Sequence, residues 1–187
     1  MQAARGASLT RDRTSGPGAS RLNLLLGVAV VAWLVDLTTK ILAERELADR
    51  APVDLIGSLL RLNLTRNAGA AFSTGRSLTP VIALFAVVAF AAVVVLAARV
   101  RTTGWAWALG LLLAGIGGNL TDRIFREPGP LRGHVIDFLQ LPHWPIFNVA
   151  DICINVAALL IVLQSVRGVP LRGHAEPQVP QAPEADR

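Results

Sequence analysis

The sequence predicts an all-α membrane protein with four transmembrane helices. Of its 187 residues, 52% are hydrophobic and the mean hydropathy is +0.49, which is too apolar for a soluble domain of this length. The apolar residues gather in four runs of 17 to 21 residues, close to the length at which a helix crosses a bilayer. Most arginines lie in the tails and between the runs, where they hold membrane topology. The net charge of +5 therefore does not indicate nucleic-acid binding.

The first run extends from Leu22 to Leu42 and follows residues 1–21, whose basic, Gly/Ser/Thr/Ala-rich composition predicts a disordered tail. A cleaved signal peptide is the alternative interpretation of this beginning. It is disfavoured because Asp36 and Lys40 continue the same run and no small-x-small cleavage site follows. These two residues are four positions apart, so they share a helix face and can pair. An ordinary ion pair at the membrane surface and a functional pair are both compatible with this spacing.

A polar connection, residues 44–76, separates the first run from the second. Within it, Leu60–Thr65 alternates between apolar and polar residues, which predicts a half-buried strand. The segment Asn67–Phe72 follows, and its Asn and Gly residues indicate a turn. Two interpretations are open for this turn. It is either a loop that caps a hairpin or a substrate-facing loop in which Asn67 presents its amide.

The second run, Thr79–Ala98, has no charged residue, and the third, Gly104–Leu120, contains small residues at four-residue spacing. That spacing places Gly110, Ala114 and Gly118 on one helix face and lets another helix approach closely.

The third run leads into Asp122 and Arg123, which are adjacent and must therefore point to different partners on a helix. A structural polar cluster and a direct catalytic role are alternatives for this pair.

The fourth run, Ile146–Val166, begins with a capping sequence in which Asn148 is a favourable N-cap and Asp151 lies three positions later. A carboxylate at the mouth of a membrane helix is costly unless it is solvated or partnered, so it indicates a functional site. A second acid, Asp137, lies 14 residues upstream of Asp151. Pro142 and Pro145 lie between the two acids and allow the chain to turn back, so we expect the acids to meet.

Two carboxyl groups held close together share a proton, and one can then activate a water while the other protonates a carbonyl oxygen. This is the chemistry of aspartic proteases, which need no metal and no nucleophilic side chain. We expect Asp151, at a helix N-terminus, to be the ionised member. Asp137 has apolar neighbours in the sequence, so we expect it to hold the proton.

The sequence contains few of the residues that other catalytic chemistries require. The single cysteine, Cys153, excludes an internal disulfide and a cysteine-based zinc site. The histidines at 134, 143 and 174 are not in metal-ligand spacing, and neither a G-x-S-x-G elbow nor a Walker motif is present. From the residues alone, a polar gate in a small transporter or proton-conducting protein and a non-enzymatic membrane scaffold are alternatives to a protease.

Four spans would put both termini on one side of the membrane, but the charges do not say which side. Lysine and arginine divide nine to nine between the two sides, so the positive-inside rule does not decide the orientation.

In several blocks the sequence resembles the lipoprotein signal peptidases, the signal peptidase II family of bacteria. Five blocks occur in the family's order within residues 22–166, which makes the resemblance specific. The blocks are Asp36 with Lys40, Asn67–Phe72, Gly118–Arg123, His134–Phe138 and Phe147–Asp151.

The resemblance implies four transmembrane helices with a small extracytoplasmic β-sheet and a flanking loop or helix. It implies an aspartic endopeptidase that cuts prolipoproteins just before a cysteine carrying diacylglycerol, uses no cofactor or metal, and is inhibited by globomycin. It places the protein in the bacterial inner membrane among membrane lipids, with an extracytoplasmic site and cytoplasmic termini. The peptidase domain is expected at 22–166, with disordered tails at 1–21 and 167–187. A monomer is the default expectation, because the sequence does not determine the oligomeric state.

By the same resemblance, Asp137 and Asp151 match the family's catalytic pair. The other matched positions bind substrate or support the site, and Asp122 is interpreted as structural support. These positions are Asp36, Lys40, Asn67, Gly69, Asn119, Asp122, Arg123, Asn148 and Ala150.

Overall fold

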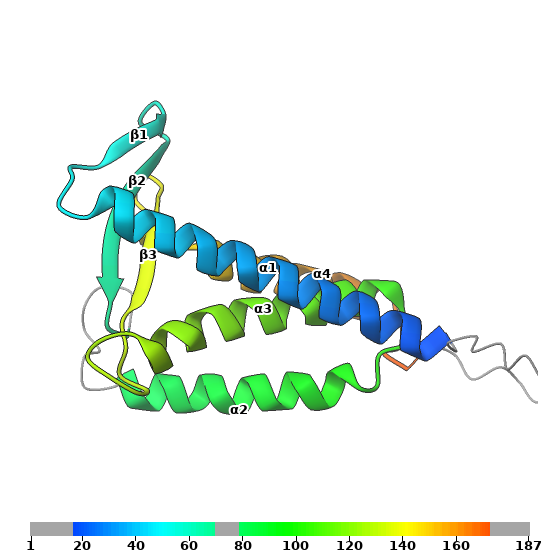
Figure 1. Ribbon diagram of the computed structural model, residues 1–187. Coiled ribbons are helices and arrows are strands. Elements are labelled where there is room, and N and C mark those ends of the chain that lie inside the picture. Colours follow the sequence, from blue (N-terminus) through cyan, green and yellow to red (C-terminus); the bar gives the residue numbers. More distant parts are fainter. Residues whose placement is uncertain (1–16, 70–78, 173–187) are drawn as a thin grey trace, which may run out of the picture.

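The computed structural model describes residues 17–69 and 79–172. The described residues form four helices and a three-stranded antiparallel sheet (Figure 1). The helices are α1 (Pro17–Leu47), α2 (Thr79–Ala97), α3 (Thr103–Phe125) and α4 (Val149–Val166), and the strands are β1 (Val53–Ile56), β2 (Leu60–Asn67) and β3 (Val135–Gln140). The flanking loop or helix expected in the 44–76 connection is described only as far as Gly69, because residues 70–78 lie outside the described part of the chain.

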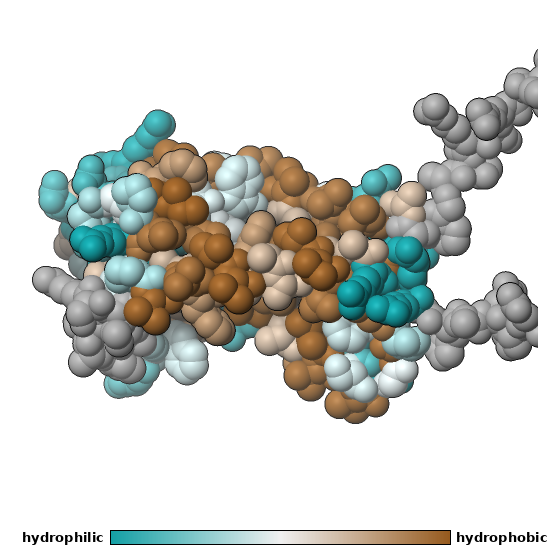
Figure 2. Space-filling model, turned by 90° about the horizontal axis from the view of Figure 1, so that it is seen from below, coloured by the Kyte–Doolittle hydropathy of each residue, from teal (hydrophilic) through white to brown (hydrophobic). Residues whose placement is uncertain are grey.

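Each predicted apolar run forms a helix. Three of these helices are long and apolar enough to cross a membrane: α1 from Ala19, α2 and α4. The third run, in α3, is not among them, because its glycine, tryptophan and polar residues dilute its apolar content. Hydrophobic residues cover the middle of the molecule and hydrophilic residues gather toward its two ends (Figure 2), as expected for a protein that crosses a bilayer.

The first helix is longer than the sequence predicted. It begins at Pro17 rather than Leu22, and it continues five residues past Leu42 to Leu47. Its 31 residues are about 46 Å long at 1.5 Å per residue, which exceeds the roughly 30 Å of bilayer hydrocarbon. The extra length carries the C-terminal turns of α1 to the level of the sheet.

Helix α3 lies at the centre of the bundle and packs against α1, α2 and α4 (Figure 1). The predicted small-residue face makes this possible, because Gly110 lies against the Leu25 carbonyl of α1 and Gly118 lies against Asp36. A neighbouring glycine, Gly115, faces α4, where an added Cβ would lie 2.6 Å from the carbonyl oxygen of Ala150. Backbones therefore approach side chains directly at these contacts.

The sheet lies across one end of the helices, opposite the start of α1 and the end of α4 (Figure 1). The strand predicted at Leu60–Thr65 is β2, which lies between β1 and β3. In the β2–β3 register Thr65 is opposite Asp137, so the acid sits within the sheet. Ile136 and Phe138, on either side of it in the sequence, are buried against the last turns of α1.

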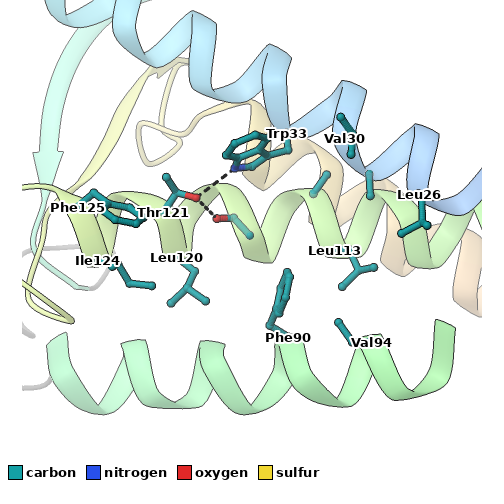
Figure 3. A pocket seen from close by; sticks show the side chains of 13 residues that line it. Leu26, Val30, Trp33, Phe90, Val94, Leu113, Leu120, Thr121, Ile124 and Phe125 are labelled. Carbon is teal, nitrogen blue, oxygen red and sulfur yellow. Dashed lines mark hydrogen bonds between the residues drawn. The ribbon is translucent and has the colours of Figure 1, made fainter. Parts of the chain in front are cut away.

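A groove of about 390 Å³ lies between α1, α2 and α3 (Figure 3). Its floor contains two polar side chains that satisfy each other, because Trp33 Nε1 donates to Thr121 Oγ1 at 3.1 Å. The Thr121 hydroxyl in turn donates to the Gly117 carbonyl at 2.7 Å. Among the residues that the structure describes, none that lines the groove is ionisable. The groove thus offers no group for acid–base chemistry.

The α3–α4 contact predicts that Gly115→Ala is destabilising. The new methyl group would meet Ala150 and Ile154 at distances that real contacts do not show, so the helices must separate, at a cost of about 1–3 kcal/mol. Thermal unfolding of the purified protein in detergent measures this loss. The matched control is Gly27→Ala on α1, where the new methyl has open space and helix propensity favours alanine. Equal melting temperatures for the two variants would contradict the packing.

Candidate active site

The structure brings Asp137 and Asp151 to one hollow of about 430 Å³ at the sheet end of the bundle. Asp137 is held by β3 and Asp151 by the first turn of α4. Asn148 connects them. Its Nδ2 donates to Asp137 Oδ1 at 2.6 Å, and its backbone N–H donates to Asp151 Oδ2 at 3.2 Å. Between the two acids the chain reverses direction, and Leu139 and Phe147 pair in an isolated antiparallel β-bridge.

Asn148 is the N-cap of α4, as the sequence predicted. Its Oδ1 accepts from the backbone N–H of Asp151 at 2.9 Å, which together with the reverse bond makes a capping box. The same side chain also donates to Asn119 Oδ1 at 3.1 Å and to the Ile136 carbonyl at 3.3 Å. One buried amide therefore fixes the start of a helix and the position of both acids.

A buried lysine determines how Asn119 is oriented. Lys40, with 0% of its surface exposed, donates from Nζ to Asn119 Oδ1 at 3.1 Å. An ammonium group has three donors and no acceptor, so the amide oxygen of Asn119 must face it. The Nδ2 group of Asn119 then faces the other way and donates to Asp151 Oδ1 at 2.8 Å.

Lys40 also forms ion pairs with Asp36 and Asp122, both at 2.8 Å. Asp36 is 1% exposed, so this pair is not an ordinary ion pair at the membrane surface. The free oxygen of Asp36 accepts from the backbone N–H of Ala150 at 2.8 Å, and Asp122 accepts from that of Ile136 at 3.3 Å. These contacts join α1 to α4 and α3 to β3, the two elements that carry Asp151 and Asp137.

Two members of this cluster were not predicted from the sequence. Arg126 donates from Nε to Asp122 at 2.5 Å and also pairs with Glu44 at the end of α1. The spacing of four residues between Asp122 and Arg126 was a usable signal. Glu44 gave none, because its partner is 82 residues away in the chain.

The remaining predicted positions also lie around the acids. Asn67 donates from Nδ2 to Asp137 Oδ2 at 3.0 Å, and its Oδ1 accepts from the Gly69 backbone at 3.0 Å. The described start of the expected turn, residues 67–69, therefore holds the Asn67 side chain with its amide against an acid. The following residues of that motif, 70–72, lie outside the described part of the chain.

Arg123 diverges from Asp122, as adjacency on a helix predicts. It is 7% exposed, and its Nη1 has no hydrogen-bond partner among residues 17–69 and 79–172. Its charge interacts with those of Asp137, Asp122 and Asp151, so it adds positive potential to a site in which the groups that bond to the acids are neutral amides.

The surroundings of Asp137 favour its protonated form. The pKa of Asp137 is raised to about 6, chiefly by burial and also by the nearby charge of Asp151, while hydrogen bonds from Asn67 and Asn148 and the charge of Lys40 act in the opposite direction. Its sequence neighbours Val135 and Ile136 are buried, in line with the apolar flank seen in the sequence. A carboxyl group that exchanges a proton near neutral pH, beside a second carboxylate, can serve as a general acid.

Comparisons with known proteins agree on one family. Residues 28–167 match the family described as signal peptidase (SPase) II. The chain is 45% identical over 148 residues to the lipoprotein signal peptidase of Mycobacterium tuberculosis, covering 79% of this chain and 73% of the relative. It is 45% identical over 163 residues to that of Mycobacterium avium, covering 87% of each chain, and 45% identical over 161 residues to that of Streptomyces coelicolor, covering 84% and 76%.

Two solved bacterial membrane enzymes, determined by the in meso method at 2.3 and 1.9 Å resolution, share the fold. The first superposes with a TM-score of 0.69 at 22% identity and covers 82% of this chain and 94% of its own. The second gives 0.66 at 24% identity and covers 78% and 94%.

The contacts of Asp137 predict a shift in its titration when Asn67 is replaced. The hydrogen bond from Asn67 lowers the pKa of Asp137, which is about 6 in the wild type. Asn67→Ala should therefore move the protonation midpoint of Asp137 to a higher pH. Infrared absorption of the protonated carboxyl group, identified by its loss in Asp137→Asn, measures the midpoint. Asn63→Ala is the control, because Asn63 lies on the same strand but bonds to Gln140. The idea is wrong if both variants titrate like the wild type.

Proposed function

Because this chain belongs to the signal peptidase II family, we propose that Asp137 and Asp151 are its catalytic pair. The protein is a membrane protease that removes the signal peptide from prolipoproteins, as lipoprotein signal peptidases do. The observation that carries the catalytic assignment is that the two acids line one hollow and are joined through Asn148.

In the proposed reaction, Asp151 is the ionised member and removes a proton from a water molecule. The water oxygen attacks the scissile carbonyl carbon, while Asp137 transfers its proton to the carbonyl oxygen. The tetrahedral intermediate collapses when Asp151 gives its proton to the leaving nitrogen and Asp137 recovers one from the intermediate. The carbon–nitrogen bond breaks. The signal peptide leaves with a new carboxyl group and the lipoprotein with a free amine.

The supporting residues keep the two acids chemically different. Asn67 and Asn148 bond to the two oxygens of Asp137, while Asn119 and the capping backbone N–H bond to Asp151. Such fixed donors are preorganised and cost no rearrangement during the reaction. We assign the Lys40 cluster a positioning role, because it reaches the acids through Asn119 rather than by direct contact.

The substrate is proposed to carry diacylglycerol on the cysteine that follows the scissile bond. Acyl chains keep that bond at the bilayer surface, which is the depth of the first turn of a membrane helix. The wall of the hollow supports this depth, since it continues from Asp151 along α4 through Ile152 to Val156. Globomycin is proposed to occupy the same hollow, and membrane lipids to cover the apolar groove of Figure 3.

We further propose that α3 is a fourth span and that the site faces outward, with both termini in the cytoplasm. The 23 residues of α3 are about 35 Å long, and the other three helices surround it.

The charges support this orientation. At the site end, ion pairs are formed by Lys40, Arg50, Arg61, Arg66 and Arg126, while Arg45, Arg123 and Arg132 form none with a described residue. At the other end, no ion pair to a described residue is formed by Arg21, Arg99, Arg101, Arg167 or Arg172. The unpaired arginines would hold that end in the cytoplasm.

The catalytic proposal predicts that Asp137→Asn and Asp151→Asn each abolish cleavage of a diacylglyceryl-modified prolipoprotein. Each variant removes one member of a proton-sharing pair, so we expect a loss of several orders of magnitude in kcat while the protein still folds. Globomycin should inhibit cleavage by the wild type in the same assay. Asp49→Asn is the control, because this residue is exposed and its positive φ tolerates asparagine. Wild-type turnover by either site variant would exclude the assignment.

The orientation predicts where reporter fusions appear. Fusions after Arg101 and Arg172 should report a cytoplasmic position, and a fusion after Asp49 should report an extracytoplasmic one, because each of the four helices would cross the membrane once. Compartment-specific enzyme reporters measure this in cells. The opposite pattern at any of the three points would refute four spans with an outward site.

A further inference from the structure

A second hollow lies beside the one that holds the two acids. It has a volume of about 470 Å³, and Trp144 and Pro145 line both hollows. Trp144 is 65% exposed, so its ring is not part of the hydrophobic core and lies between the two hollows. A chain that passes the acids can therefore continue from one hollow into the other past Trp144 and Pro145.

The two hollows differ in what forms them. The hollow of the acids includes residues of α4 from Asp151 to Val156, so it descends along a candidate membrane span. Among the described residues, those that line the second hollow come from no helix. Ser58 lies in the β1–β2 turn, Gln140 ends β3, and residues 141–145 belong to the connection to α4. The second hollow is therefore built entirely outside the spans.

We propose that this second hollow is a subsite for the first residues of the mature lipoprotein, those that follow the lipidated cysteine. The inference rests on the proposed function of Asp137 and Asp151. With the scissile bond at these acids, the signal peptide and both acyl chains extend into the bilayer, along the α4 wall. The mature polypeptide is the part of the substrate that must leave the membrane, and the adjoining hollow lies on that side.

The lining suits a peptide. Each peptide residue brings a backbone N–H and C=O that need partners when water is displaced. Ser58 offers a hydroxyl and His143 an imidazole to such groups. The oxygen of Gln140 accepts from Asn63 Nδ2 at 3.0 Å, which leaves its own amide N–H groups to donate. Arg61 pairs with Asp54 at 2.5 Å, so the hollow selects hydrogen-bonding groups rather than a charge.

The wall is preformed. The base of the loop is closed by backbone bonds between Leu139 and Phe147, at 2.8 and 2.9 Å, and Trp144 N donates to the Leu141 carbonyl at 3.3 Å. On the opposite side, Arg61 and Gln140 are cross-strand partners in the β2–β3 register. A site whose walls are already fixed loses little conformational entropy when it binds an extended chain.

The test compares two synthetic diacylglyceryl-modified prolipoprotein peptides, cleaved by the full-length protein in lipid–detergent micelles. The peptides are identical through the lipidated cysteine. One ends a single residue later, and the other continues for four more mature residues, which reach about 13 Å at 3.3 Å per residue. The wild type should cleave the long peptide with about tenfold higher kcat/KM, a difference of about 1.4 kcal/mol, expressed mainly in KM.

Two variants should lose most of that preference while cleaving the short peptide like the wild type. They are the single variant Ser58→Ala and the double variant Gln140→Ala/His143→Ala. Unchanged cleavage of the short peptide also shows that they fold. The control Arg132→Ala alters an exposed residue that lines neither hollow and should keep the preference. A wild type indifferent to length, or variants that slow both peptides equally, would overturn the subsite. Failure of the catalytic proposal is separate, because Asp137→Asn would then cleave the short peptide.

Discussion

The ammonium group of Lys40 is the buried charge on which this architecture depends. It holds Asp36 on its own helix, Asp122 on α3 and the amide of Asn119. Through these partners it connects α1 to the start of α4 and α3 to β3. Removing one member of a buried ion pair leaves the other uncompensated, at a cost of about 3–5 kcal/mol. The buried charges of Lys40, Asp36 and Asp122 therefore hold one another in place, and their geometry is transmitted to the acids through Asn119 and the backbone of Ala150.

Close packing is the second constraint, and it acts at the same level of the bundle. Gly118 brings α3 against Asp36, and Gly115 brings it against Ala150. Without these approaches the carboxylate of Asp36 would not reach the backbone N–H of Ala150. Electrostatics and sterics thus converge on the first turn of α4, where Asn148 and Asp151 lie. The membrane core and the polar site are one cooperative unit rather than a scaffold with an added centre.

Local patterns in the sequence predicted much of this arrangement. Apolar runs predicted the helices, alternation predicted β2, and the Asn148 cap predicted the start of α4 with Asp151 in its first turn. The C-terminal end of α1 was missed because packing against the sheet extends the helix past its apolar run to Leu47. Its earlier start, at Pro17, lies at the end away from the sheet (Figure 1) and has no such partner there among the described residues. The link from Arg126 to Glu44 spans 82 residues, and no local period encodes such a contact. Likewise, nothing in the sequence pattern indicated that Trp144 separates two hollows.

The neutral amides around the acids have a consequence for the medium in which the protein works. Charges that are buried are screened by dissolved ions much less than exposed ones, and Lys40, Asp36 and Asp122 are almost fully buried. Changes in ionic strength should thus leave the geometry of Asn119 and Asn148 unaltered. Asp137 has no such protection against protons, because its pKa of about 6 lies within the range of natural external media. The site, which we propose faces outward, is thus insulated from changes in salt concentration but not from changes in external pH.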